Sequence, residues 1–127
     1  AINNKKIIHY EIIKGTTTAE TFKKFIINVT KKINNNMYLL MDNARIHHSR
    51  IVKEYIETTT NKLLFSVPYS PNYNPIENIF SIIKNEIGRR NFINNKSKLD
   101  TLITNSIKLV TSTQLNNCFN RSVNYVY

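Results

Sequence analysis

Two carboxylates in this sequence stand where carboxylates can hold a metal ion. Asp42 directly follows the apolar run MYLLM, and Glu77 stands between the proline-rich segment PYSPNYNP and the apolar run IFSII. Open α/β sheets place their binding sites at the carboxyl ends of strands, and carboxylate oxygens suit Mg²⁺ or Mn²⁺. Two such ions can activate water and stabilise the leaving oxygen of a phosphodiester. The alternative is purely structural, with Asp42 as a turn residue and Glu77 complementing a helix dipole.

The elements that must position these acids alternate between strands and helices in the first half of the chain. Residues 5–13 (KKIIHYEII) predict a strand, and the capping box TTAE, with Thr17 as the N-cap, predicts the helix that follows. Residues 37–41 (MYLLM) predict a buried strand that ends at the first acid. A helix is expected from about Ser49, and residues 62–67 (KLLFSV) predict the next buried strand.

The second half of the chain predicts helices. Asn74 can cap a helix that has Pro75 at its first position, where the missing N–H costs nothing. Gly88 is expected to end this helix. Further helices are predicted from Ser97 and over Thr113–Arg121.

This order of elements indicates how the two acids meet. The predicted order is strand, helix, strand, helix, strand, helix, helix. This order is typical of an α/β layered domain with at least two parallel strands. The crossover helix should make the second and third strands neighbours. We therefore expect Asp42 and Glu77 to converge at the carboxyl edge of the sheet.

The composition indicates one small domain with a polyanionic partner. The 127 residues carry 18 Lys and Arg against 8 Asp and Glu, a net charge of +10 that is typical of nucleic-acid binding. An AT-rich genome, which favours Lys, Asn and Ile codons, would give a similar composition. The single Cys118 excludes an internal disulfide framework, and no apolar run is long enough to span a membrane. We expect a protein that is not secreted and has no membrane partner, in the nucleus of a eukaryote or otherwise in the cytoplasm.

Two blocks of sequence, MDNARIHHS and VPYSPNYNPIENIFSIIK, resemble the catalytic domain of mariner-like and related insertion-sequence transposases. That family has an Asp-Asn-Ala-x-x-His block at the end of a strand. A Pro-Tyr-Ser-Pro-x-x-Asn-Pro-Ile-Glu block then enters a helix with an aromatic residue and a lysine, here Phe80 in place of the usual Trp, and Lys84. The interval from Asp42 to Glu77 matches the branch whose third acid is a glutamate.

The resemblance implies a DDE transposase with an RNase H-like fold, an α/β domain of three layers in which helices cover both faces of a mixed sheet. It implies metal-dependent phosphodiester hydrolysis and strand transfer at transposon ends, with a triad of acids that binds two Mg²⁺ or Mn²⁺ ions. Asp42 maps to the second acid and Glu77 to the third, and the proline-rich loop is expected to hold Glu77 at the metals. The implied partners are transposon-end and target DNA and a second transposase chain, as a homodimer or a full-length copy, with no small-molecule substrate.

Several other side chains have possible supporting roles. Asn43 can steady Asp42 or contact a phosphate, and His47 matches the family's histidine, with a helix-cap role as the alternative. Lys84 lies two turns beyond Glu77, where it can meet a DNA phosphate or remain solvated. The arginines that can neutralise phosphates are Arg45, Arg50, Arg89 and Arg90. Tyr69 and Tyr73 can stack on bases or pack the loop. His9 and His48 are expected to be surface or strand residues.

The sequence also departs from the family pattern. The first acid of the family lies on a strand upstream of the segment that corresponds to IIHYEII, so we expect residues 1–127 to be a partial catalytic domain without its N-terminal strands. Glu11 is not expected to replace that acid. Without the missing strands, MYLLM should expose an unpaired apolar side. The chain alone should be inactive. The alternatives are a non-enzymatic basic module that binds nucleic acid or pairs with a transposase, and an RNase H-like nuclease of another family.

Overall fold

A parallel pair of strands organises the first half of the protein in the computed structural model, which describes residues 1–67, 74–93 and 99–124. The strands pair with Tyr38 opposite Lys62 and Met41 opposite Phe65, which confirms the predicted parallel neighbours. The elements follow in the order α1 (Ala19–Thr30), β1 (Tyr38–Met41), the 3₁₀ helix η1 (Arg45–His48), α2 (Arg50–Glu57), β2 (Lys62–Phe65), α3 (Pro75–Ile93), α4 (Leu99–Lys108) and α5 (Ser112–Asn124). No helix within these described ranges is long and apolar enough to cross a membrane.

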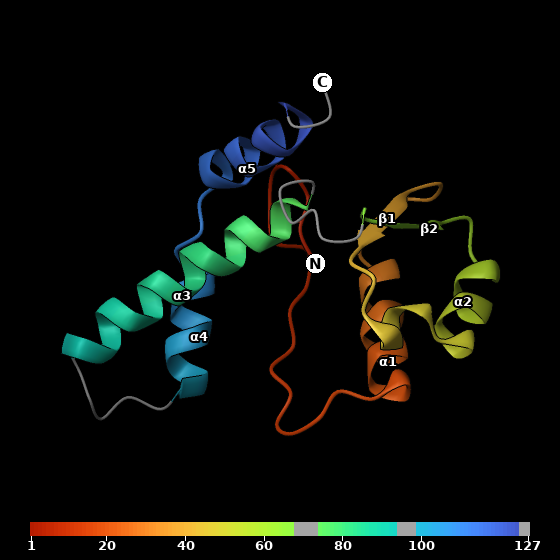
Figure 1. Cartoon of the computed structure of the whole chain (residues 1–127), viewed down its shortest axis with the longest axis horizontal. Coiled ribbons are helices and arrows are strands. Elements are labelled where there is room, and N and C mark those ends of the chain that lie inside the picture. Colours follow the sequence, from red (N-terminus) through yellow and green to blue (C-terminus); the bar gives the residue numbers. More distant parts are fainter. Residues whose placement is uncertain (68–73, 94–98, 125–127) are drawn as a thin grey trace.

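The apolar residues form two separate cores. The sheet core lies where α1 and α2 pack on one face of β1 and β2, and the helical core lies where α3 packs on α5 (Figure 1). The buried residues of the sheet core are Ile26, Met41, Val52 and Ile56. Those of the helical core are Ile79, Leu115 and Cys118. Asp42 therefore follows an element of one core, and Glu77 belongs to an element of the other.

Both strands are buried on one face only, which corrects the expectation of two fully buried strands. Leu39 and Leu63 pack against the sheet core, whereas Tyr38, Leu40 and Leu64 on the opposite face are exposed. Successive side chains of a strand point to opposite faces, and α1 and α2 cover only one of them. Within the described residues β2 is the one strand that pairs with β1, so the other edge of β1 has no strand beside it there.

The strand predicted over residues 5–13 is wrong. The segment has an isolated antiparallel bridge between Ile2 and Ile7 and no regular structure from Ile8 to Ile13. An extended segment becomes a strand only when its backbone pairs with a neighbouring strand, and the described part of the chain places none beside it. The segment runs between the two halves of the molecule (Figure 1), with Ile2 packed against the helical core and the His9 ring 5.5 Å from the Phe25 ring of α1.

Two helix ends also differ from prediction. The N-cap of α1 is Thr18 rather than Thr17, because the Thr18 hydroxyl accepts a hydrogen bond from the Thr21 N–H at 3.2 Å. Helix α3 continues through Gly88 to Ile93. A glycine ends a helix when it takes the left-handed conformation, and Gly88 does not, since Gly15 is the glycine with a positive φ.

Candidate active site

Asp42 stands immediately after β1 with one carboxylate oxygen fixed. Its Oδ1 accepts a hydrogen bond from the Ala44 N–H at 3.0 Å and lies 2.8 Å from Nδ1 of His47. The side chain is 50% exposed. Within the described residues no hydrogen bond or ion pair is made by Oδ2, so this oxygen can still accept a bond from a ligand.

His47 holds Asp42 from inside the fold. Its ring is stacked on Phe22 of α1, with the ring centroids 4.4 Å apart, and its side chain is only 19% exposed. Nδ1 also lies 3.1 Å from the backbone carbonyl oxygen of Asp42. Because both neighbours of Nδ1 are acceptors, this nitrogen carries the hydrogen and donates to Asp42. The ring thus links the end of β1 to α1 and restricts the carboxylate.

Asn43 and His48 form a second connection at the same edge. The Asn43 side-chain amide donates to the carbonyl oxygen of Ser66, just beyond β2, and its Oδ1 lies 3.0 Å from Nε2 of His48. The His48 ring stacks on Phe65 of β2 at 3.9 Å between centroids. Both ends of the Asn43 side chain are therefore used to join the two strand ends, rather than to contact Asp42.

His48 is exposed, as expected for a surface residue, but its bond to Asn43 was not predicted from the sequence. The signal that could have identified it is a repeated spacing. His47 bonds to Asp42 and His48 bonds to Asn43, each five residues back along the chain. Two consecutive histidines on a 3₁₀ helix that follows a strand can thus form hydrogen bonds to two consecutive residues at the end of that strand.

Glu77 lies in the first turn of α3, as predicted. The Asn74 side chain caps the helix by accepting the Ile76 N–H at 3.3 Å, and its backbone carbonyl accepts the Glu77 N–H at 3.2 Å. Asn74 is only 5% exposed, whereas the Glu77 side chain is exposed. The predicted restraint by the proline-rich loop falls on residues 68–73, which lie outside the described residues.

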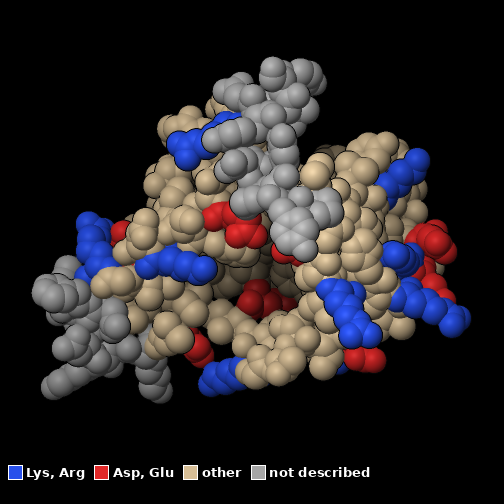
Figure 2. Space-filling view, viewed as in Figure 1, with Lys and Arg blue, Asp and Glu red and all other residues tan. Residues whose placement is uncertain are grey.

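The carboxyl ends of β1 and β2 and the first turn of α3 all point towards the middle of the molecule (Figure 1). Figure 2 shows acidic side chains at a hollow near the centre of this face, with Lys and Arg mainly around it. Within the described ranges, however, no three His, Cys, Asp or Glu side chains are grouped to hold a metal. Glu11 is engaged elsewhere, because its Oε2 accepts from His9 at 2.8 Å and from Asn28 at 3.4 Å.

The predicted phosphate-binding residues fall into two groups. Arg50 pairs with Glu54 at 2.6 Å and Arg89 pairs with Glu86 at 2.7 Å, so both guanidinium groups already have a carboxylate partner. Lys84 and Arg45 are exposed and have no ion pair within the described part of the chain. The side chains of Arg90, Tyr69 and Tyr73 lie outside the described residues.

A sequence model of the family described as DDE superfamily endonuclease matches residues 1–100 of this chain. The matched range contains both Asp42 and Glu77. No curated protein sequence matches the chain.

Solved structures share the fold. The Mos1 transposase catalytic domain, solved with raltegravir and Mg, matches with a TM-score of 0.70 at 17% identity over 94% of this chain and 65% of that one. A chain of the Mos1 strand transfer complex matches with a TM-score of 0.59 at 20% identity, over 94% of this chain and 40% of its own length. A chain of the simian T-cell lymphotropic virus intasome, in complex with the PP2A regulatory subunit B56 gamma, matches with a TM-score of 0.61 at 15% identity over 81% and 41% of the two chains.

These matches confirm the predicted RNase H-like fold, because the helix-rich α/β arrangement with its small parallel sheet corresponds to the fold of the Mos1 catalytic domain. The expected mixed sheet with helices on both faces is not seen in the described residues, where two parallel strands have α1 and α2 on one face. The chain spans less than two thirds of the length of each of these solved chains. At 15–20% identity the likeness shows the fold and not the chemistry.

Proposed function

Because this chain belongs to the DDE superfamily of endonucleases, we propose that it is part of a transposase catalytic domain that acts on transposon ends by metal-dependent hydrolysis and strand transfer. In this proposal residues 1–127 form a partial domain that supplies the second and third acids, Asp42 and Glu77. The observation that carries the proposal is the placement of one acid at the end of β1 and the other in the first turn of the helix after β2, the parallel neighbour of β1.

Both acids fit a hard divalent cation. Oδ2 of Asp42 is free of protein contacts among the described residues, and the Glu77 side chain is exposed. Mg²⁺ and Mn²⁺ prefer such oxygen donors and keep several waters when carboxylates are few. When bound, the ions would activate the attacking water and stabilise the leaving oxygen.

The protein's own contribution is to hold the two carboxylates. His47 and the Ala44 N–H fix Oδ1 of Asp42, and within the described residues the other oxygen has no hydrogen bond. The Asn74 cap closes the first turn of α3 and thereby limits the positions that Glu77 can take. Held in this way, the acids lose less freedom when they bind a ligand.

DNA is the proposed partner because the net charge is +10 and two exposed cations near these elements, Arg45 and Lys84, are free of ion pairs in the described residues. Two of the matched solved structures are named as a strand transfer complex and an intasome. We propose that the chain likewise works beside a second transposase chain, as a homodimer or with a full-length copy.

The test is Mn²⁺ binding followed by plasmid nicking. We expect Asp42→Asn and Glu77→Gln each to weaken Mn²⁺ binding at least tenfold, while Glu20→Gln, which changes an exposed acid in the first turn of α1, leaves it unchanged. Equal Mn²⁺ affinity in all three variants would refute the acid pair as a metal site.

We expect the unsubstituted chain to leave a supercoiled plasmid intact in Mg²⁺, because in this proposal it supplies only the second and third acids of the family's triad, Asp42 and Glu77. Mg²⁺-dependent nicking that Glu77→Gln abolishes would contradict inactivity while supporting the site.

A non-enzymatic module is the second candidate, favoured by the lack of a third His, Cys, Asp or Glu grouped with the acid pair in the described ranges. An electrophoretic shift with DNA separates the two functions. A module binds DNA equally well in EDTA and in Mg²⁺ and tolerates Glu77→Gln, whereas a catalytic domain binds more tightly when the metal joins the acids to the scissile phosphate.

A further inference from the structure

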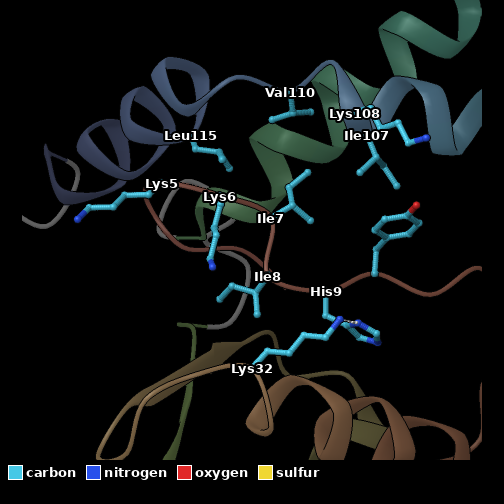
Figure 3. Close-up of a pocket in the computed structure, with 11 residues that line it drawn as sticks. Lys5, Lys6, Ile7, Ile8, His9, Lys32, Ile107, Lys108, Val110 and Leu115 are labelled. Carbon is cyan, nitrogen blue, oxygen red and sulfur yellow. Dashed lines mark hydrogen bonds between the residues drawn. The ribbon is translucent and has the colours of Figure 1, made fainter.

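A second surface feature lies away from the two acids. It is a groove of about 500 Å³ between the N-terminal segment, the turn after α1 and the junction of α4 with α5 (Figure 3). We call it the lysine groove. Its lining residues are Lys5, Lys6, Ile7, Ile8, His9, Tyr10, Lys32, Ile107, Lys108, Val110 and Leu115. A volume of this size lies within the range of ~300–1,000 Å³ that accommodates a small organic molecule.

The charge of the lysine groove has one sign. Four of its lining residues are lysines and none is acidic. Within the described part of the chain, the ammonium groups of Lys5, Lys6 and Lys108 have no carboxylate partner. Lys108 stands in the last turn of α4, where it complements the helix dipole. That explanation does not extend to Lys5 and Lys6, which belong to no helix.

The fourth lysine fixes the groove in place. Nζ of Lys32 donates to Nδ1 of His9 at 2.8 Å, and Nε2 of His9 donates in turn to Glu11 at 2.8 Å (Figure 3 draws the first of these bonds). The Asn28 amide of α1 also reaches Glu11 at 3.4 Å. This network joins the N-terminal segment to α1, so the walls of the groove are held before any ligand arrives.

The floor of the groove is apolar, and one aromatic side chain is available at its edge. It is lined by aliphatic side chains of the N-terminal segment, including Ile7 and Ile8, and by Leu115 of the helical core. Tyr10 is 40% exposed. Cations combined with an apolar floor and an exposed aromatic ring suit a nucleotide, whose phosphate meets the lysines while its sugar and base cover the apolar surface.

From these features we propose that the lysine groove binds the phosphodiester backbone of one DNA strand, at a site separate from Asp42 and Glu77. A single strand can place its phosphates on the lysines and its bases on the apolar surface, whereas a duplex, whose bases are paired inside, offers the groove its backbone alone. An acidic peptide has the complementary charge but gains nothing from Tyr10 beyond packing. The inference rests on the DNA partner proposed above and does not depend on metal binding.

The test measures binding of a labelled oligothymidylate of about 12 nucleotides, within the site sizes of ~4–16 nucleotides known for single-strand-binding domains. Fluorescence anisotropy is recorded in EDTA, so that no metal contributes. The groove variant is Lys5→Gln, Lys6→Gln and Lys108→Gln combined, and Lys32 is kept because it bonds to His9. The matched control removes the same charge from exposed lysines outside the groove that also have no ion pair in the described residues: Lys24→Gln, Lys31→Gln and Lys62→Gln. Circular dichroism checks that both variants fold.

We expect the groove variant to bind on the order of tenfold to 100-fold more weakly at about 0.1 M salt. Three contacts to single-strand phosphates contribute about 2 to the slope of log K against log salt concentration, and the variant loses them. The control should lose less than about threefold. Equal losses in the two variants would overturn the inference, as would tighter groove-dependent binding of a duplex or of oligoglutamate. If the unsubstituted chain binds no DNA at all, the DNA partner itself fails together with the groove.

Discussion

Replacing Asn74 by alanine tests how Glu77 is positioned. Asn74 is 5% exposed and accepts the Ile76 N–H through its side chain at 3.3 Å. Its backbone carbonyl, which the substitution keeps, accepts the Glu77 N–H at 3.2 Å. Asn74→Ala therefore removes the side-chain cap and leaves the Ile76 N–H without its partner at the start of α3.

The expected loss follows from that single bond. Replacing an N-cap asparagine by alanine costs about 1 kcal/mol, and for a chain of this length such a loss lowers Tm by roughly 3–6 °C. The same free energy corresponds to a factor of about five in the equilibrium between a closed and an open first turn. Mn²⁺ affinity should fall with the population of the closed turn, so we expect a loss of up to about fivefold.

The assay pairs thermal unfolding, followed by circular dichroism, with Mn²⁺ titration. Asn78→Ala is the matched control, because it changes the same residue type inside the same helix and should leave Tm unchanged or slightly raised. Asn74→Ser keeps an oxygen that can cap the helix and should restore most of both losses. If Asn74→Ala and Asn78→Ala have the same Tm and Mn²⁺ affinity, the cap does not hold Glu77.

Two further predictions concern the helical core. Leu115 is 1% exposed, so Leu115→Ala should lower the free energy of unfolding in urea by about 2–5 kcal/mol, whereas Leu109→Ala, at a side chain that is 49% exposed, should change it by less than about 0.5 kcal/mol. Similar losses of unfolding free energy in the two variants would contradict the burial of Leu115 in the helical core. Burial raises the pKa of the Cys118 thiol, more than the nearby Arg121 cation lowers it, so the thiolate fraction below this pKa is smaller than that of a free cysteine. Iodoacetamide should alkylate the folded protein near pH 8 more slowly than the urea-unfolded chain, and equal rates would contradict the buried thiol.

The elements that carry the two acids could be predicted because their signals are local. The apolar stretches before Asp42 and before Ser66 are short, and the crossover between them leaves a parallel pair as the simplest connection. Asn74 followed by Pro75 marks the start of α3 in the chain itself. Each acid is thus located by residues within a few positions of it.

The wrong predictions needed information from distant parts of the chain. Residues 5–13 have the composition of a strand, but within the described residues their backbone bonds reach only the first residues of the chain. Their side chains bond to Asn28 of α1 and to Lys32 just after it. Gly88 permits a helix end without requiring one, and α3 continues beyond it. The contacts of His48 could not be predicted for the same reason, because they involve Asn43 and the Phe65 ring of the neighbouring strand.

The division into two cores has a consequence for the candidate site. Asp42 is held through β1 and His47 by the sheet core, while Glu77 stands on α3, whose Ile79 belongs to the helical core. Among the described residues the N-terminal segment connects the two, through Ile2 at one end and His9 at the other. The distance between the carboxylates therefore depends on how the cores sit against each other, and not on either core alone. A divalent ion held by both acids would add a direct link between the cores, and its binding free energy would stabilise the arrangement that brings the acids together. In this molecule metal binding and the relative position of the two cores are thus expected to be coupled.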